Sequence, residues 1–233
     1  MIRKIQSIAA TCVLVLAMLS AIGSANELVP SVARVHTLAN GNIAGSGSGV
    51  LVDVEGTAGF VLTCHHVVTG DVEYRILVDF PSESQYAYKA TIVESRQDED
   101  VALLMIPRPN VKPRQINWTP VSTGQRVWQS GFGHPKVSPR QVMGRVRMID
   151  EQFVRVRPLA RSGDSGGPLL DSQGRVVGIV SGIDVKRWKD DRTGQVHVNV
   201  EKNRMTHAAA LSANQWLRNH LPEQSIVVSQ NGP

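Results

Sequence analysis

Residues 163–169 read Gly-Asp-Ser-Gly-Gly-Pro-Leu, and the interpretation of the whole chain starts from this stretch. A serine hydroxyl is a poor nucleophile until a base removes its proton. It also needs donors aimed at the oxygen that becomes negative during acyl transfer. Glycines beside Ser165 let the backbone turn tightly, so that N–H groups of the Gly163-Asp164-Ser165 stretch can point into one small cavity. The pattern predicts a nucleophilic serine at position 165 and an oxyanion hole beside it.

A histidine that could act as the base lies upstream, in the stretch Phe60-Val61-Leu62-Thr63-Cys64-His65-His66. An apolar strand is expected to end at Thr63, and His66 follows three residues later. Adjacent side chains tend to point in different directions, so one histidine would serve as the base while the other is a neighbour. The spacing leaves His65 and His66 as the two candidates for the base.

An aspartate directly before a buried strand would complete the arrangement. The run Asp98-Glu99-Asp100 precedes the apolar residues 101–104. Such a carboxylate can be fixed by packing, hold the correct imidazole tautomer and balance the charge that develops on it. We predict this role for Asp100, and we expect Asp98 and Glu99 to form a solvated acidic turn.

These three motifs resemble those of the trypsin-like serine proteases, with six consecutive matches at 163–168. In that family the base histidine follows the threonine of the strand end by three residues, so the resemblance selects His66 as the base. The order His66, Asp100, Ser165 is then the chymotrypsin order. The run Gly-Ser-Gly-Ser-Gly at 45–49 is most similar to the bacterial HtrA/Deg branch, and we interpret it as packing and backbone clearance. The resemblance implies an all-β fold of two six-stranded antiparallel barrels with a C-terminal helix. It also implies a serine endopeptidase that forms an acyl-enzyme on protein or peptide substrates and needs no cofactor.

The pattern of strands and turns fits that architecture. Period-two or continuous apolar runs predict strands throughout residues 32–200. Three prolines within 107–113 indicate a linker between two halves. We expect a peptidase domain over 26–233, with a first barrel at about 32–108, a second at about 120–205 and a helix at about 207–221.

The resemblance also points to a specificity pocket formed by Leu159, Val180, Ser181 and Gly182. Leu159, six residues before Ser165, offers no charge to a basic substrate side chain. We therefore predict cleavage after small or medium apolar residues.

Two departures from the family pattern concern Asp164 and the chain ends. No Ile-Val-Gly-Gly start is present, so a new N-terminal amine is not expected to pair with Asp164, which needs another partner. The HtrA/Deg branch usually has asparagine there. No PDZ module is expected after the helix.

The first 25 residues resemble a signal peptide. Arg3 and Lys4 precede an apolar run, and Gly23-Ser24-Ala25 offers a cleavage site. A secreted or periplasmic protein is expected, and an uncleaved membrane anchor is the alternative. After cleavage the net charge falls from +5 to +3, and Cys64 is the one remaining cysteine, so no intramolecular disulfide is expected. The scattered basic residues do not indicate nucleic-acid binding, and the oligomeric state stays open.

Three rival interpretations compete with this one. Gly163 to Gly167 also fits the Gly-x-Ser-x-Gly motif of α/β-hydrolase esterases, which need alternating helices and strands. A binding protein built on an inactive protease fold is the second rival. The third makes Cys64 a nucleophile or a metal ligand with His65 and His66. Because neighbouring residues rarely converge on one metal, we expect no metal site and a small buried thiol at Cys64.

Overall fold

The computed structural model describes residues 30–69, 75–83, 87–133, 139–157, 159–183, 186–189, 196–199 and 205–221. The expected signal peptide, 1–25, lies outside these residues. Within the described part, no helix is both long enough and apolar enough to cross a membrane.

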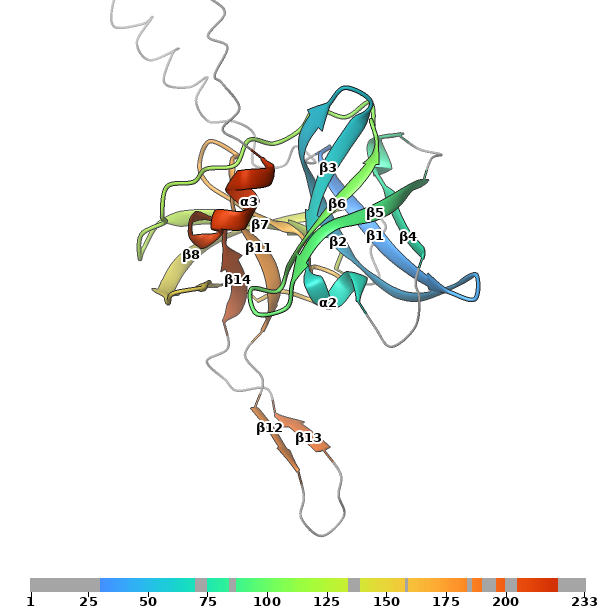
Figure 1. Ribbon diagram of the computed structural model, residues 1–233. Coiled ribbons are helices and arrows are strands. Elements are labelled where there is room, and N and C mark those ends of the chain that lie inside the picture. Colours follow the sequence, from blue (N-terminus) through green and yellow to red (C-terminus); the bar gives the residue numbers. More distant parts are fainter. Residues whose placement is uncertain are drawn as a thin grey trace, which may run out of the picture.

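Twelve strands close into two six-stranded antiparallel barrels (Figure 1), which confirms the expected fold class. When the strands of each barrel are numbered from first to sixth along the chain, both barrels have the same cyclic order of neighbours: first, second, third, sixth, fifth, fourth. The sequence nevertheless shows no internal repeat. The first barrel contains β1 (Val32–Ala39), β2 (Asn42–Glu55), β3 (Ala58–Thr63), β6 (Val101–Pro107), β5 (Ala87–Arg96) and β4 (Arg75–Asp79). The second contains β10 (Pro168–Leu170), β11 (Val176–Ile183), β14 (Thr206–Ala210), β9 (Phe153–Arg157), β8 (Arg140–Ile149) and β7 (Arg126–Gly131).

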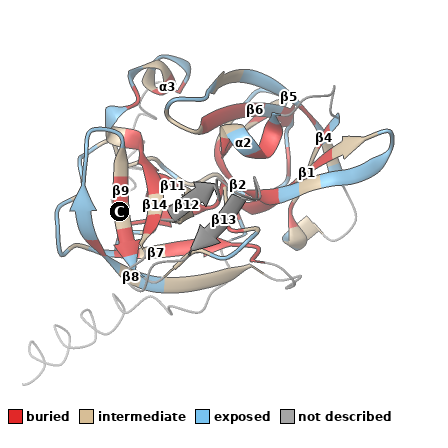
Figure 2. Cartoon of the chain, turned by 90° about the horizontal axis from the view of Figure 1, so that it is seen from below, coloured by how far each residue is buried: buried red, intermediate tan, exposed pale blue. Residues whose placement is uncertain are grey.

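Alternating side chains explain why these segments form barrel walls. In β9, Val154 and Val156 are buried, whereas Arg155 is half-buried and Arg157 is exposed. Successive side chains of a strand point to opposite faces, so the valines fill the barrel and the arginines face solvent. In Figure 2, buried residues gather in the middle of the molecule, and exposed residues lie mainly on the outer hairpins.

The two barrels share one apolar cluster. Buried residues of the first barrel, such as Leu104, are continuous with Phe132, Leu170 and Ile179 of the second half. A separate cluster around Val146 fills the second barrel. Burying apolar surface across the interface stabilises the docked arrangement, so the two barrels form one packed unit.

The linker between the barrels follows the surface of both. It starts after β6 at Pro107 and ends before β7, as the prolines indicated. The Arg114 N–H donates to the Leu51 carbonyl in the first barrel, and the Asn117 N–H donates to the Val176 carbonyl in the second. The linker is therefore bonded to each half.

The C-terminal helix is shorter than expected, because the chain from 206 onward first forms a strand. Thr206–Ala210 is β14, which pairs with β9 and β11 and closes the second barrel. A short 3-10 turn, η2 (Leu211–Ala213), and the helix α3 (Gln215–His220) follow. The predicted helix start at 207 was wrong because small apolar residues at 208–210 fit a buried strand as well as a helix. Barrel closure decides between them.

Three further elements were not predicted as observed. His65–Val68 forms a one-turn helix, α2, and Pro81–Glu83 forms a 3-10 turn, η1. β13 (Val196–Asn199) lies at the end of the range 32–200 in which strands were predicted. It pairs with β12 (Lys186–Lys189) in a separate two-stranded sheet that projects away from the second barrel in Figure 1.

Candidate active site

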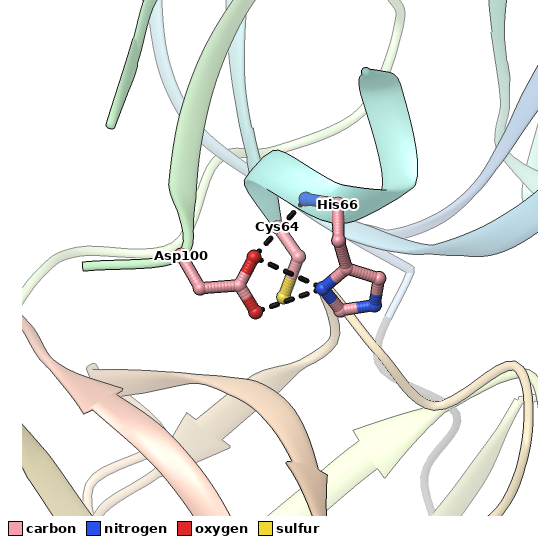
Figure 3. A group of neighbouring side chains, drawn as sticks. All are labelled: Cys64, His66 and Asp100. Carbon is pink, nitrogen blue, oxygen red and sulfur yellow. Dashed lines mark hydrogen bonds and ion pairs between the residues drawn. The ribbon is translucent and has the colours of Figure 1, made fainter. Parts of the chain in front are cut away.

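The imidazole of His66 is held by a carboxylate from another part of the first barrel. α2 places His66 just after β3, and its Nδ1 lies 2.9 and 2.8 Å from the two carboxylate oxygens of Asp100. The His66 backbone N–H also donates to Asp100 Oδ1 at 3.0 Å (Figure 3). Two attachments to one carboxylate fix both the backbone and the ring of His66.

Asp100 adopts a backbone conformation that few residues tolerate. Its φ is +51°, in the left-handed region that aspartate enters more readily than most residues. Burial alone would raise the pKa of this carboxyl. Hydrogen bonds from His66 and Ser181 outweigh that effect and lower the pKa below its usual value. The carboxylate is therefore ionised at neutral pH and can only accept, which places a proton on His66 Nδ1; in the neutral tautomer that this selects, the lone pair is on Nε2.

Ser165 reaches the same carboxylate through one intermediate residue. Its hydroxyl donates to the Ser181 carbonyl at 3.1 Å, and the Ser181 hydroxyl donates to Asp100. Among the hydrogen bonds of the described residues, none joins Ser165 Oγ directly to His66. The structure thus brings Ser165, Ser181, Asp100 and His66 into one chain of contacts. It gives Ser181, predicted as a pocket residue, a bond to the carboxylate.

A tight turn precedes Ser165. The Asp164 N–H donates to the Arg161 carbonyl at 2.9 Å, and Gly163, the third residue of this turn, has a φ of +92°. A positive φ at that position belongs to a type II turn and requires glycine. The Asp164 N–H is occupied by this bond. The predicted oxyanion hole is therefore reduced to the N–H groups of Gly163 and Ser165.

Glycine is also required directly after Ser165. Gly166 has a φ of +86°, and a Cβ placed on it would lie 1.9 Å from the Ser48 carbonyl oxygen. Any side chain at position 166 would clash with this oxygen, so only glycine fits there. The approach is this close because the Ser48 N–H donates to the Ser165 carbonyl at 2.7 Å, across the interface between the barrels.

Asp164 finds a partner that the sequence did not identify. Its fully buried carboxylate accepts from Arg140 Nη2 at 2.5 Å and from Arg140 Nε at 3.2 Å. Gln129 Nε2 and the Arg161 N–H donate to the same oxygen, Oδ2, at 3.1 and 2.9 Å. Arg140 also donates to the Leu159 carbonyl at 3.1 Å. An internal arginine from β8 thus neutralises the charge and ties together the chain on both sides of the turn.

The predicted pocket residues fall into two groups. Leu159, Ser181 and Gly182 are partly accessible, and a Cβ added to Gly182 would meet open space. Val180 is fully buried, its N–H donates to Gly167 and its carbonyl accepts from Gly166. Both backbone groups of Val180 are therefore bonded within the fold, and its place in the pocket wall stays a prediction.

Cys64 lies beside His66 and Asp100, and the three offer ligand atoms within 4.8 Å of one another (Figure 3). Each atom is already bonded, since the thiol donates to the Val180 carbonyl at 3.0 Å and the imidazole to the carboxylate. Burial, followed by the charge of Asp100, raises the pKa of Cys64 well above its usual value. A protonated, buried thiol is neither a good nucleophile nor a good metal ligand, and the predicted buried thiol is confirmed.

Two neighbours of the predicted residues have separate contacts. His65 Nδ1 lies 2.8 Å from Ser95 Oγ, away from Asp100. Asp98 is exposed, as expected for a solvated turn. Glu99 is not simply solvated, because it accepts a hydrogen bond from Trp216 Nε1 of α3 at 2.7 Å. The acidic turn is therefore tied to the C-terminal helix.

We expect Arg140→Met to lower the free energy of unfolding by about 3–5 kcal/mol, because it leaves the buried Asp164 charge unpaired. In an Asp164→Asn background the same change should cost much less. Urea unfolding of the four proteins of this double-mutant cycle measures the coupling. Arg147→Met, an exposed change on the same strand, is the control and should stay within about 0.5 kcal/mol. Equal losses with and without Asp164 would contradict the pairing.

Comparison with known proteins agrees with this geometry. The sequence model of the trypsin-like peptidase domain matches residues 47–179, more than half of the chain. Protease Do-like 1, chloroplastic, of Arabidopsis thaliana is 33% identical over 156 residues, covering 60% of this chain and 33% of that protein. The chain thus spans about a third of that relative's length.

Solved structures show the same fold. A serine endoprotease from Yersinia pestis superposes with a TM-score of 0.64 at 23% identity, covering 85% of this chain and 66% of that one. The active form of the Rv3671c protease from M. tuberculosis gives 0.63 at 21% identity, covering 84% and 83%. With two antiparallel barrels, the 163–169 motif in contact with the first barrel and a family match over more than half of the chain, the chain belongs to the trypsin-like peptidase domain family.

Proposed function

We propose that the chain is a serine endopeptidase in which Ser165 is the nucleophile, His66 the general base and Asp100 the residue that orients the imidazole. The observation that carries this proposal is the contact of His66 Nδ1 with both carboxylate oxygens of Asp100. Because His66 Nδ1 donates its hydrogen to the carboxylate of Asp100, the lone pair of the neutral imidazole is on Nε2, the atom that must accept the serine proton.

The proposed reaction proceeds in two acyl-transfer steps. Ser165 Oγ attacks the carbonyl carbon of the scissile peptide while His66 Nε2 accepts its proton. The oxyanion that forms accepts hydrogen bonds from the N–H groups of Gly163 and Ser165. Collapse of this intermediate breaks the C–N bond, and His66 returns the proton to the leaving amine. Water, activated by His66 in the same way, then hydrolyses the acyl-enzyme and restores Ser165.

The nucleophile must rotate before it can react. Its hydroxyl donates to the Ser181 carbonyl at 3.1 Å in this structure, so the proposed reaction requires this hydrogen bond to break and the hydroxyl to turn to His66. Hydrogen bonds of catalytic groups are often long or misaligned without substrate and tighten in the complex. The Ser181 contact therefore fits a resting nucleophile.

The rival enzyme class does not fit this architecture. An α/β-hydrolase places its nucleophile between a strand and a helix of a largely parallel sheet, with the aspartate and histidine after the serine in the chain. Here both barrels are antiparallel, and His66 and Asp100 precede Ser165. An inactive binding protein is separated from an enzyme by the following test.

Ser165→Ala and His66→Ala should each abolish labelling by a fluorophosphonate probe and lower peptide hydrolysis at least about a thousandfold, because the nucleophile or its base is lost. His65→Gln is the matched control, since His65 bonds Ser95 instead of Asp100, and it should retain labelling. Labelling that persists in His66→Ala, or a wild-type protein that the probe does not label, would contradict the proposal that the chain is an enzyme.

The proposed pocket favours small or medium apolar residues before the cut. Leu159 is partly accessible and uncharged at the position where an acid would pair with lysine or arginine. Digestion of a peptide library should give cleavage after Val, Leu or Ala, and Leu159→Asp should raise the relative rate after Lys or Arg by about tenfold or more. Faster wild-type cleavage after Lys or Arg than after Val or Leu would contradict this pocket.

We also propose that the protein acts outside the cytoplasm, after removal of residues 1–25. The support is the Arg3-Lys4 start, the apolar run and the small residues at 23–25. N-terminal sequencing of the exported protein should begin at Asn26 or within a few residues of it. A mature protein that retains Met1 and sediments with membranes would instead indicate an anchor.

A further inference from the structure

We infer that the Ser48 hydroxyl is a positioning device for the oxyanion hole, acting from the first barrel on the turn that carries it in the second. This inference rests on the proposed function. Ser48 belongs to the 45–49 motif that was interpreted only as packing and backbone clearance. The structure assigns its side chain two hydrogen bonds, both to residues of the other barrel.

The direction of both bonds is fixed by chemistry. Ser48 Oγ accepts from the Phe132 N–H at 2.8 Å, and the carbonyl oxygen of Gly163 can only accept, so the hydroxyl proton must point to it, at 2.6 Å. Ser48 is fully buried, and water does not compete for these bonds. A hydroxyl that both accepts and donates in a buried site has one orientation, so it can hold its partners rigidly.

Ser48 donates hydrogen bonds to the backbone carbonyls of both residues of the proposed oxyanion hole. Its N–H donates to the Ser165 carbonyl at 2.7 Å and its Oγ to the Gly163 carbonyl at 2.6 Å. Gly163 and Ser165 are the residues whose N–H groups are the proposed oxyanion donors. One residue of β2 thus fastens, by their carbonyl groups, both residues that must aim their N–H groups at the reacting oxygen.

The Gly163 carbonyl bond completes the support of the turn. The carbonyl of Gly163 and the N–H of Asp164 belong to one planar peptide group. Ser48 holds the oxygen of that group, and the Arg161 carbonyl holds its hydrogen at 2.9 Å. With both ends fixed, rotation at Gly163 is restrained, although a glycine at a φ of +92° would otherwise rotate easily.

Ser48 also connects this turn to the strand that leads to His66. Its carbonyl accepts from Thr63 Oγ1 at 2.7 Å, and Thr63 is the last residue of β3 before Cys64 and α2. The same residue therefore contacts the end of the base strand and the nucleophile turn, and it can set the two at a constant distance.

Ser48→Ala tests the inference because it removes the hydroxyl and leaves the backbone bond to Ser165 in place. We expect kcat per active site to fall between about tenfold and a hundredfold, with KM changed less than about twofold, because the lost bonds act on the transition state. Inhibition by an apolar peptide aldehyde, whose adduct oxygen occupies the oxyanion hole, should weaken by the same factor. The end point of fluorophosphonate titration should stay near that of the wild type.

Two further variants keep the test sharp. Ser48→Cys preserves the volume but offers a weak donor and acceptor, so it should resemble Ser48→Ala, and it carries the test if the alanine variant does not fold. Ser46→Ala, in the same motif, removes a hydroxyl that bonds His36 at 2.8 Å and should leave kcat unchanged.

Each outcome decides the matter. Unchanged kcat in Ser48→Ala, full activity in Ser48→Cys, or a loss explained entirely by a smaller titrated fraction would overturn the positioning role while the protease proposal stands. Wild-type protein that neither labels nor hydrolyses peptides would overturn the proposed function, and the role of Ser48 in it would fall as well.

Discussion

The structure depends on the close passage of two backbones from different barrels, where the Ser48 N–H meets the Ser165 carbonyl at 2.7 Å. That bond brings the Ser48 carbonyl so near to residue 166 that only glycine fits there. Neither barrel contains the whole site, since His66 and Asp100 belong to the first and Ser165 to the second. The apolar cluster shared by the barrels therefore stabilises the site as well as the fold.

Two buried or half-buried carboxylates lie near Ser165, the proposed nucleophile, and their surroundings give them different roles. Asp100 faces an imidazole and a serine hydroxyl, which favour its ionised form without a permanent cation. Asp164 is bonded to Arg140, a permanent cation, inside the second barrel. A carboxylate without a fixed cation can balance the charge that develops on His66 in the proposed reaction. A carboxylate that is already paired with an arginine, such as Asp164, is suited to holding the turn before Ser165 in place.

Sequence reasoning succeeded where the signal is local. The alternation at Val154 and Val156 fixed a strand, and the motifs around His66 and Ser165 selected residues that the structure places in one network. It failed where tertiary pairing decides. The alanines at 208–210 suit helix or strand equally, and only pairing with β9 and β11 makes them a strand. Arg140 as partner of Asp164 could not be foreseen, because nothing in a sequence states which arginine a folded chain brings to a buried acid.

The same distinction explains why Ser48 was first interpreted through its glycines. A glycine-rich run indicates close packing from the sequence alone. The role of one hydroxyl within it depends on its hydrogen-bond partners, which lie 84 and 115 residues away in the chain. Both barrels have the same strand order, and each is closed by its own six strands. What the pair adds is a set of hydrogen bonds across the interface. Ser48 donates to Gly163 and Ser165 and accepts from Phe132, and Ser181 donates to Asp100. Closure of the barrels fixes the fold of each half. The hydrogen bonds between the barrels then place the residues of the two halves in the geometry that the proposed acyl transfer requires.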